Sequence, residues 1–313
     1  MNGAPIVVLG GSGFVGRHLV AQLAAGGYRV VVPTRHRERA RHLILLPTVD
    51  VVECDVHDPA VLASLVRGAS SAINLIGILN ETSRGDFGRV HVELPRKLIA
   101  ACRAAGVPRL LHMSALNADP QGPSAYLRSK GEAEALVAAS PLRWTIFEPS
   151  IVVGPEDSFL NLFAKLQRLL PVIALAGAGA RFQPIGVEDV AAAFRRGLDN
   201  DATQGKRYPL CGPKVYSLRQ LVAYVGELTG CERPIVALGP TLSRLQAGVL
   251  ERLPGKLMSR DNLASMQKDS VCDCPFPELL GGPPAALEAI APEYIGPGWA
   301  RMRPPGVRPR ARE

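Results

Sequence analysis

The chain lacks a hydrophobic run long enough to cross a membrane. Apolar residues make up 47% of its 313 residues, yet no uninterrupted apolar stretch reaches the ~18 residues that a transmembrane helix requires. It also lacks a basic segment followed by an apolar one at its start, so we expect no export signal. A cytoplasmic protein is expected, with one large domain or one domain and a smaller lobe.

Cysteine is scarce and shows no metal-binding spacing. The chain has six cysteines, at positions 54, 102, 211, 231, 272 and 274. Only Cys272 and Cys274 lie close together, and a C-x-C pair without histidines or a second pair is a poor metal site. We therefore predict no metal, and we expect reduced, mostly structural thiols.

The positive charge is unevenly distributed. Residues 301–313 hold five arginines and one glutamate, and so supply half of the formal net charge of +8. Prolines and the absence of apolar periodicity predict an extended basic tail over 296–313. It has no interleaved aromatic residues for base stacking, so no nucleic-acid partner is expected. An anionic membrane surface or an acidic protein is favoured over nucleic acid, beside the alternative of a merely solvated tail.

A glycine-rich turn near the N-terminus is the most informative motif. The apolar run Ile6–Leu9 leads into Gly10, Gly13 and Gly16, and a helical pattern follows. Strand, tight turn and helix are the entry unit of a dinucleotide-binding fold, in which the amides at the helix start face the pyrophosphate. The predicted cofactor contacts in this turn are Gly10, Gly11, Ser12, Gly13, Phe14, Val15 and Gly16.

The end of the second predicted strand, 29–33, indicates which dinucleotide binds. An NAD site usually has an acidic residue about 20 residues after the glycines, which accepts hydrogen bonds from the ribose 2′-hydroxyl. This chain has Thr34 and Arg35 there, and no acid before Glu38. A guanidinium pairs with a 2′-phosphate, which a carboxylate would repel. We therefore predict NADP(H) rather than NAD(H).

Strands and helices alternate through the first half of the chain. Further strands are predicted at 49–54, 71–76, 109–113 and 143–147, with helices at 59–67, 87–105 and 126–139 between them. Such alternation predicts an α/β fold with a doubly wound parallel sheet. Asp55 ends the third strand, where its carboxylate could meet the adenine amino group. Asn74 and Gly77 end the fourth strand, beside the expected cofactor.

The regular alternation ends after Pro149. We predict an NADP(H)-binding domain over 1–150. A smaller α+β lobe over 151–295, interleaved with the core, is predicted to contact a substrate or partner. Its apolar segment 169–180 and the amphipathic stretch 241–258 are either core or a partly exposed patch that meets a membrane or a partner.

Tyr126 and Lys130 form the second chemical motif. Four residues apart on a predicted helix, they share one face. The lysine can hold the cofactor ribose, and its charge is expected to lower the pKa of the phenol so that the tyrosine can exchange a proton with a carbonyl.

These motifs together resemble the short-chain dehydrogenase/reductase superfamily, in its extended and atypical branches. Gly10–Gly16, Asp55-Val56, Tyr126–Lys130 and Gly186–Ala191 occur in the expected order. The resemblance implies that Val56 also lines the cofactor site. It also implies a catalytic serine or threonine after the fifth strand.

The candidate for that hydroxyl is Ser114, but extended members often carry it one position later, where this chain has Ala115. Only 12 residues separate Ser114 from Tyr126, about half the spacing of active extended enzymes. Loss of an oxyanion-stabilising hydroxyl costs ~2.7–4 kcal/mol in comparable sites. The cofactor-binding parts are therefore intact, whereas the catalytic parts are eroded.

A closer resemblance extends over roughly residues 5–270. It rests on the segments Ser114–Asn117, Ser124–Lys130, Glu148–Ser150, Gly154–Asn161 and Ser259–Asn262. These segments are similar to the NADPH-binding accessory subunits of respiratory complex I and their bacterial relatives.

The resemblance implies that Pro149 contacts the cofactor and that the nucleotide is structural. It also implies that complex I subunits near the quinone region are partners, with the protein peripheral on the inner face of the cytoplasmic membrane. Two alternatives stay open. One is an active NADPH-dependent reductase or epimerase acting on a small or lipid-like carbonyl through Tyr126 and Lys130. The other is a factor in ubiquinone biosynthesis.

Overall fold

The computed structural model describes residues 3–252 and 257–296. It divides into two compact units, and the chain passes back and forth between them. The first unit comprises Met1–Pro149, Val187–Leu210 and Asp273–Pro283. The second unit comprises Ser150–Gly186, Cys211–Cys272 and Pro284–Glu313.

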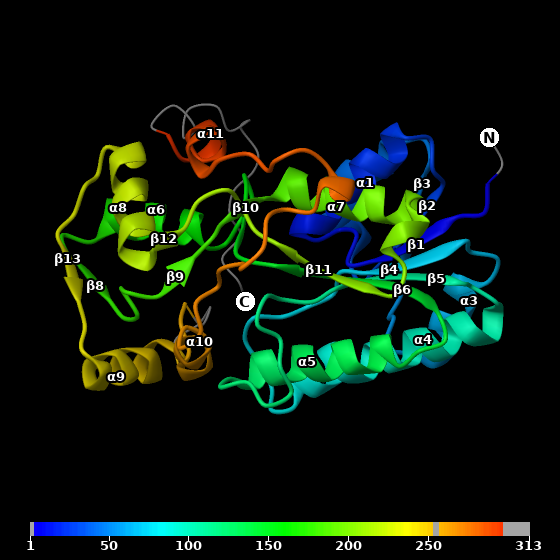
Figure 1. The fold of residues 1–313 in the computed structure, drawn as a ribbon, viewed down its shortest axis with the longest axis horizontal. Coiled ribbons are helices and arrows are strands. Elements are labelled where there is room, and N and C mark those ends of the chain that lie inside the picture. The colour runs from blue at the N-terminus through cyan, green and yellow to red at the C-terminus, as the bar shows by residue number, and fades with distance from the viewer. Residues whose placement is uncertain (1–2, 253–256, 297–313) are drawn as a thin grey trace. The chain divides into compact units, whose positions relative to one another are not determined.

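The first unit contains a seven-stranded parallel sheet (Figure 1). Its strands are β1 (Ile6–Leu9), β2 (Val30–Thr34), β3 (Val49–Glu53), β4 (Ser71–Asn74), β5 (Arg109–Met113), β6 (Arg143–Pro149) and β11 (Lys206–Leu210). They lie in the order β11-β6-β5-β4-β1-β2-β3. The order reverses at β1 and β4, the point of a doubly wound sheet where ligands bind. The predicted fold class is confirmed.

Helices cover both faces of this sheet. They are α1 (Phe14–Ala25), α2 (Arg41–Ile44), α3 (Pro59–Val66), α4 (Leu94–Ala105), α5 (Ala125–Ala138) and α7 (Val187–Asp199), with short turns η1 (Arg37–Ala40), η2 (Gly88–Glu93), η3 (Asp201–Thr203) and η4 (Glu278–Leu280). Helices α1 and α7 lie on one face, and α3, α4 and α5 on the other (Figure 1). The central strands β1 and β4 are buried along their whole length, as a parallel sheet covered on both faces requires.

Local sequence signals set where these helices begin and end. Asp58 accepts a hydrogen bond from the Ala60 amide, and Pro59 follows as the first residue of α3. Ser124 caps α5 in the same way through the Leu127 amide. Gly106 ends α4 in the left-handed conformation, with φ 70°, which glycine adopts without strain.

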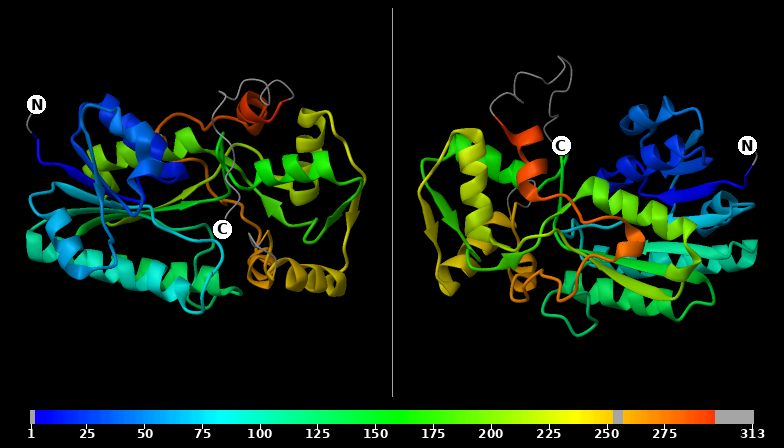
Figure 2. Two further views of the ribbon diagram at one scale, coloured as in Figure 1. Left: turned by 180° about the vertical axis from the view of Figure 1, so that it is seen from behind. Right: turned by 45° about the horizontal axis from the view of Figure 1, so that its top comes forward.

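The second unit is a small α+β lobe. Its elements are β7 (Val152–Val153), α6 (Leu160–Leu169), β8 (Ile173–Leu175), β9 (Arg181–Phe182), β10 (Ile185–Gly186), β12 (Tyr216–Ser217), α8 (Leu218–Thr229), β13 (Ile235–Ala237), α9 (Pro240–Leu250), α10 (Arg260–Ser265), α11 (Leu287–Ile290) and α12 (Pro292–Ile295). The strands pair as β7 with β10, β9 with β12 and β8 with β13. Figure 2 shows the lobe from two further sides.

Helices α6, α8 and α12 enclose the core of this lobe, with Phe163, Leu221 and Val225 among its buried side chains. Tyr294 donates a hydrogen bond of 2.6 Å to Asp157, which also caps the start of α6 through the Leu160 amide. The lobe therefore has a hydrophobic core of its own.

The apolar segment 169–180 divides between core and surface. Ile173 and Leu175 of β8 are buried, whereas Leu169 at the end of α6 is 67% exposed. Among the described helices, none is long and apolar enough to span a membrane. The predicted basic tail 296–313 lies outside the described residues, apart from Gly296.

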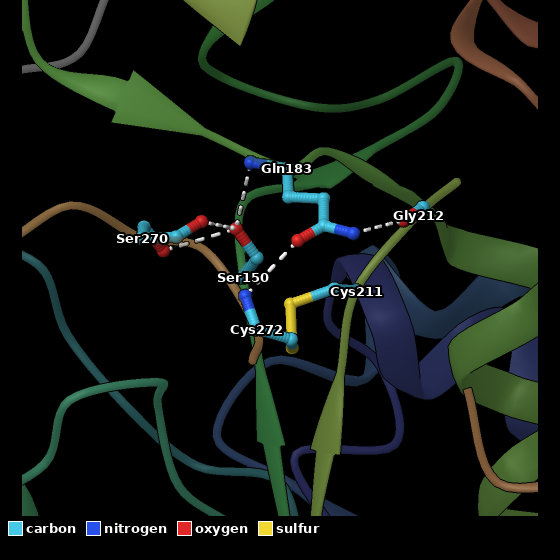
Figure 3. The surroundings of a disulfide bond; sticks show 6 residues. All are labelled: Ser150, Gln183, Cys211, Gly212, Ser270 and Cys272. Carbon is cyan, nitrogen blue, oxygen red and sulfur yellow. Dashed lines mark hydrogen bonds between the residues drawn. A yellow bond between two sulfur atoms is a disulfide. The ribbon is translucent and has the colours of Figure 1, made fainter. Parts of the chain in front are cut away.

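The expectation of reduced thiols is wrong for one pair, because Cys211 and Cys272 form a disulfide (Figure 3). Their Cα atoms lie 6.1 Å apart, although 61 positions separate them in sequence. Such a separation leaves no spacing signal in the sequence. The four other cysteines, Cys54, Cys102, Cys231 and Cys274, are free.

Polar contacts of Gln183 surround this disulfide. Its amide nitrogen donates to the Gly212 carbonyl at 2.6 Å, and its amide oxygen accepts from the Cys272 amide at 3.0 Å. Nearby, Ser150 donates to the Ser270 carbonyl at 2.7 Å (Figure 3). Four stretches of chain, around residues 150, 183, 211–212 and 270–272, are thus held together close to the boundaries where the chain enters and leaves the lobe.

Arg109, a buried residue at the start of β5, connects several elements at one end of the sheet. The Arg109 guanidinium donates to the Arg143 and Gly197 carbonyls, each at 2.6 Å, and to the hydroxyls of Thr145 and Thr203 at 2.7 and 2.9 Å. Burial lowers its pKa to about 10, so it stays charged at neutral pH. Its hydrogen bonds connect β5, β6, α7 and η3.

We expect Arg109→Leu to destabilise the protein by about 2–4 kcal/mol, because it removes four charge-assisted hydrogen bonds of a buried side chain, which join these elements. Arg29→Leu is the matched control, since Arg29 makes an exposed ion pair with Asp50 at 3.6 Å. Loss of that pair should cost less than about 1 kcal/mol. Urea denaturation measures both, and equal losses would contradict the role assigned to Arg109.

Candidate functional site

Three positions at the turn between β1 and α1 require glycine. Gly10 has φ +79°, which strains any side-chain-bearing residue. A Cβ added at Gly16 would lie 2.1 Å from the Gly10 carbonyl oxygen, and one at Gly11 would lie 2.9 Å from Val32. Helix, turn and strand therefore pack closer than side chains would permit, as predicted from the glycine spacing.

The start of α1 is open to an anion. Gly13 is its N-cap residue and supplies no side-chain cap, so backbone amides and the positive end of the helix dipole remain for a ligand. Val15 is buried and Phe14 half-buried. A cradle of backbone amides without side chains fits a pyrophosphate, and therefore a dinucleotide.

The ends of β2 and β3 lie next to this turn. The Ser12 hydroxyl donates to Thr34 at 3.5 Å, which places the end of β2 beside the glycines. Arg35 follows and is exposed, and it makes no ion pair within the described part of the chain. Asp55 is exposed, its carboxylate accepting from the His57 amide at 2.9 Å, and Val56 is buried.

The loop after β4 is held from inside the core. Asn74 is buried, with its amide nitrogen 3.2 Å from His112 Nδ1 and its amide oxygen accepting from the Ile76 amide at 3.2 Å. Its side chain thus shapes the loop rather than facing outward. A Cβ on Gly77 would lie only 3.1 Å from Lys130 Nζ, so this glycine lets the lysine reach the loop.

Tyr126 and Lys130 lie on α5, as predicted. Lys130 is buried, and its ammonium donates to the Met113 carbonyl at 3.2 Å. Burial lowers the pKa of Lys130 to about 8, against an opposing effect of Glu134. The pKa of Tyr126 was expected to fall beside the lysine, but burial instead raises it to about 12. The hydroxyl is therefore protonated and poorly acidic at neutral pH.

Ser114 and Pro149 occupy buried positions at the ends of β5 and β6. The Pro149 carbonyl accepts from the Leu116 amide at 3.0 Å, and the Ser114 amide donates to Phe147 at 2.8 Å. The Ser114 hydroxyl lies close enough to the Glu134 carboxyl to lower its pKa, although no hydrogen bond of ordinary geometry joins them. The serine thus lies beside a carboxyl group in the protein interior.

His91 also belongs to the site, although no sequence motif contains it. Its Nε2 accepts from the Ile78 amide at 3.0 Å, so Nδ1 carries the proton toward the Ser129 hydroxyl, 2.8 Å away. Its ring packs on Phe87 and against Tyr126. Burial lowers the pKa of His91 to about 2, so it is a neutral link between the β4 loop and α5. Its four-residue spacing from Phe87 was the only sequence signal.

Two acidic side chains lie near one another, one on α5 and one on β6. Glu134 is buried one turn after Lys130, and its Oε2 is 3.7 Å from Arg207 Nε. Burial raises the pKa of Glu134. Glu148 on β6 is half-buried, and burial, together with the nearby Glu134, raises its pKa to about 7. The first unit thus holds a carboxyl group that titrates near neutral pH.

Folding stability should fall as pH rises from about 5 to about 8, because the folded protein keeps the Glu148 proton that the unfolded chain has released. We expect Glu148→Gln to flatten this loss by roughly 1–2 kcal/mol, after allowance for solvent screening. Urea denaturation across this pH range measures it. Glu132→Gln, exposed on α5, is the control, and an unchanged slope in Glu148→Gln would contradict the assignment.

Comparisons with known proteins support a domain that binds a nicotinamide nucleotide. A family model described as NAD(P)H-binding matches residues 10–159. The chain is 36% identical over 230 residues to "NADH dehydrogenase [ubiquinone] 1 alpha subcomplex subunit 9, mitochondrial" of Arabidopsis thaliana, covering 71% of this chain and 57% of that protein. It is 29% identical to "NADH-ubiquinone oxidoreductase 40 kDa subunit, mitochondrial" of Neurospora crassa, covering 94% of this chain and 80% of that one.

The chain thus spans less than two thirds of the length of the Arabidopsis protein. Among solved structures, a dTDP-glucose 4,6-dehydratase from Streptomyces venezuelae with NAD bound has a TM-score of 0.73 at 20% identity, covering 95% of this chain and 97% of that one. At this identity the likeness concerns the fold alone. Sequence similarity and fold lead to the same family, and the chain belongs to the atypical or extended short-chain dehydrogenase/reductase superfamily, with a domain that binds a nicotinamide nucleotide.

Proposed function

We propose that this protein is an accessory or assembly component of respiratory complex I, NADH:ubiquinone oxidoreductase, that holds NADP(H) as a structural element. The observation that carries the proposal is a complete nucleotide cradle combined with unprepared catalytic groups. The glycine turn packs backbone to backbone against the start of α1 and leaves the helix amides for a pyrophosphate, whereas the pKa of Tyr126 is raised to about 12. The complex I subunits to which the chain is similar support the choice of assembly.

Most of the predicted cofactor residues have a binding role in this proposal. Gly10–Gly16 hold the pyrophosphate, Arg35 pairs with the 2′-phosphate, and Asp55 lies where the adenine amino group ends. Lys130 contacts the ribose from beneath Gly77. Val56 and Pro149 support the loops at the ends of β3 and β6. When bound, the nucleotide supplies a hydride-carrying ring and three anionic groups, of which the anionic groups are what these residues recognise.

The surroundings of Tyr126 and Ser114 do not favour the catalytic roles predicted for them. A proton donor works best when its pKa is near the operating pH, which a phenol with a pKa of about 12 is not. Ser114 is buried beside Glu134, so its hydroxyl is poorly placed to polarise a substrate carbonyl. We therefore propose that the protein retains NADP(H) without turning over a substrate.

The attachment proposed for this component has two parts. The basic residues of the tail 296–313 and the exposed end of segment 169–180 would contact complex I near its quinone region, or the anionic membrane beside it. The protein would then be peripheral on the inner face of the cytoplasmic membrane. Leu169, Leu170 and Val172 are exposed large apolar side chains of that segment, and such side chains favour a partner or an interface.

NADPH should bind more tightly than NADH, because Arg35 stands where NAD-binding proteins carry an acid. Arg35→Ala should remove most of this preference, since one charge-assisted contact is worth about 1.5–3 kcal/mol. Calorimetric titration with both nucleotides measures it. Arg39→Ala, an exposed arginine in the turn η1, is the control. Equal affinities of the wild type for the two nucleotides would refute the preference.

If the nucleotide is structural, substitutions of Tyr126 and Lys130 should have different effects on its retention. Tyr126→Phe loses only a proton to exchange, so the protein should keep its nucleotide and should co-purify with complex I subunits as the wild type does. Lys130→Met removes a ribose contact and should release nucleotide. Native purification followed by mass spectrometry of bound nucleotide and proteins measures both. A substrate reduced or epimerised rapidly by wild type but not by Tyr126→Phe would favour the enzyme instead, and absence of complex I subunits would refute the partner.

A further inference from the structure

Helix α9 presents a row of apolar side chains to solvent. Leu242, Leu245 and Val249 are 56%, 63% and 51% exposed. Their spacing of three and four residues places them on one face of the helix. Within the lobe, α9 lies at the periphery with α10 beside it (Figure 1). This row is an exposed stripe on a helix that is otherwise well anchored.

The opposite face of α9 explains why the stripe points outward. Ser243 and Ala247 are buried, and the Ser243 hydroxyl donates to the Leu238 carbonyl at 3.2 Å. The Gln246 amide donates to the Ala174 carbonyl of β8 at 2.8 Å. The small and polar residues therefore fix the helix to the lobe, whereas the large apolar residues have no core to fill. A globular core would select the reverse arrangement.

Positive charge accompanies the stripe. Residues 240–260 contain four basic side chains, Arg244, Arg252, Lys256 and Arg260, and one acidic side chain, Glu251. Glu251 is already ion-paired with Arg260. Arg244 and Arg252 are exposed on α9 and just after it. Within the described residues the Arg252 guanidinium donates to the Gly248 carbonyl at 3.0 Å, and neither arginine takes part in an ion pair. The helix therefore offers apolar side chains bordered by exposed arginines.

We propose that α9 lies in the plane of an anionic phospholipid surface, with Leu242, Leu245 and Val249 in the headgroup–acyl boundary and Arg244 and Arg252 at the headgroups. Apolar stripes bordered by basic residues are typical of interfacial helices. Long arginine side chains can bury their stems and keep the charge in water. The inference deepens the proposed function by naming the element that meets the membrane.

A bilayer fits this face better than a protein does. A stable protein interface buries about 800 Å² per partner over 20–30 residues, which three side chains on an eleven-residue helix do not approach. A fluid lipid surface needs no such shape match. Its negative potential also complements the arginines, and the attraction fades within a Debye length of about 8–10 Å.

The test is flotation of the purified full-length protein with phosphatidylcholine vesicles that either contain or lack phosphatidylglycerol. Wild type should float with the anionic vesicles and less with the neutral ones. Leu245→Ser/Val249→Ser should bind anionic vesicles at least tenfold more weakly, and Arg244→Gln/Arg252→Gln should lose most of the salt-sensitive part. Ile44→Ser/Leu45→Ser, which alters exposed apolar residues of the first unit, is the matched control and should bind as wild type does.

Three outcomes overturn the proposal. The first is that wild type fails to float with anionic vesicles, and the second is that Leu245→Ser/Val249→Ser floats equally well. The third is that a variant lacking residues 301–313 loses all vesicle binding while α9 is intact, which would assign binding to the tail. Circular dichroism and nucleotide content show that each variant is folded. No complex I subunit is present in the assay, so its result is independent of whether co-purification succeeds.

Discussion

The close contact between the start of α1 and the turn after β1 is the constraint on which the nucleotide unit depends. With no room for a Cβ at Gly16, helix and turn meet backbone to backbone. This contact directs the amides at the start of α1 toward the point where the strand order of the sheet reverses. The ends of β2 and β4 are then brought to the same place, through Ser12 and Thr34 on one side and Gly10 and Ile76 on the other. A side chain at Gly16 would separate these parts.

Burial, rather than charge pairing, dominates the chemistry around α5. Tyr126 and Lys130 stand four residues apart as in active members of the superfamily, yet desolvation raises the pKa of the first and lowers that of the second. His91 is held neutral by the same effect and serves as a hydrogen-bonded link. Burial raises the pKa of Glu148 as well, and the nearby Glu134 adds to this rise.

In the smaller lobe, covalent and polar contacts hold the segments near the unit boundary together, whereas helix α9 exposes apolar side chains. The Cys211–Cys272 disulfide and the contacts of Gln183 join segments that are distant in sequence where the chain passes between the units. Closing a loop of this length restricts the unfolded chain and favours the folded lobe. Helix α9 is fixed to β8 by a polar residue, Gln246. Its leucines are therefore free to meet a surface outside the protein.

The sequence by itself determined the parallel sheet, the nucleotide turn and the position of Lys130, because each follows from local patterns: alternation of strands and helices, glycine spacing, and a four-residue repeat on one helix. Only the tertiary structure decided which side chains are buried. Asn74 turns into the core, Ser114 lies beside Glu134, and Tyr126 becomes less acidic instead of more. It also brought Cys211 to Cys272 and divided 169–180 between core and surface. These outcomes depend on contacts between residues far apart in the chain, and on the desolvation that such contacts impose, neither of which a local pattern records.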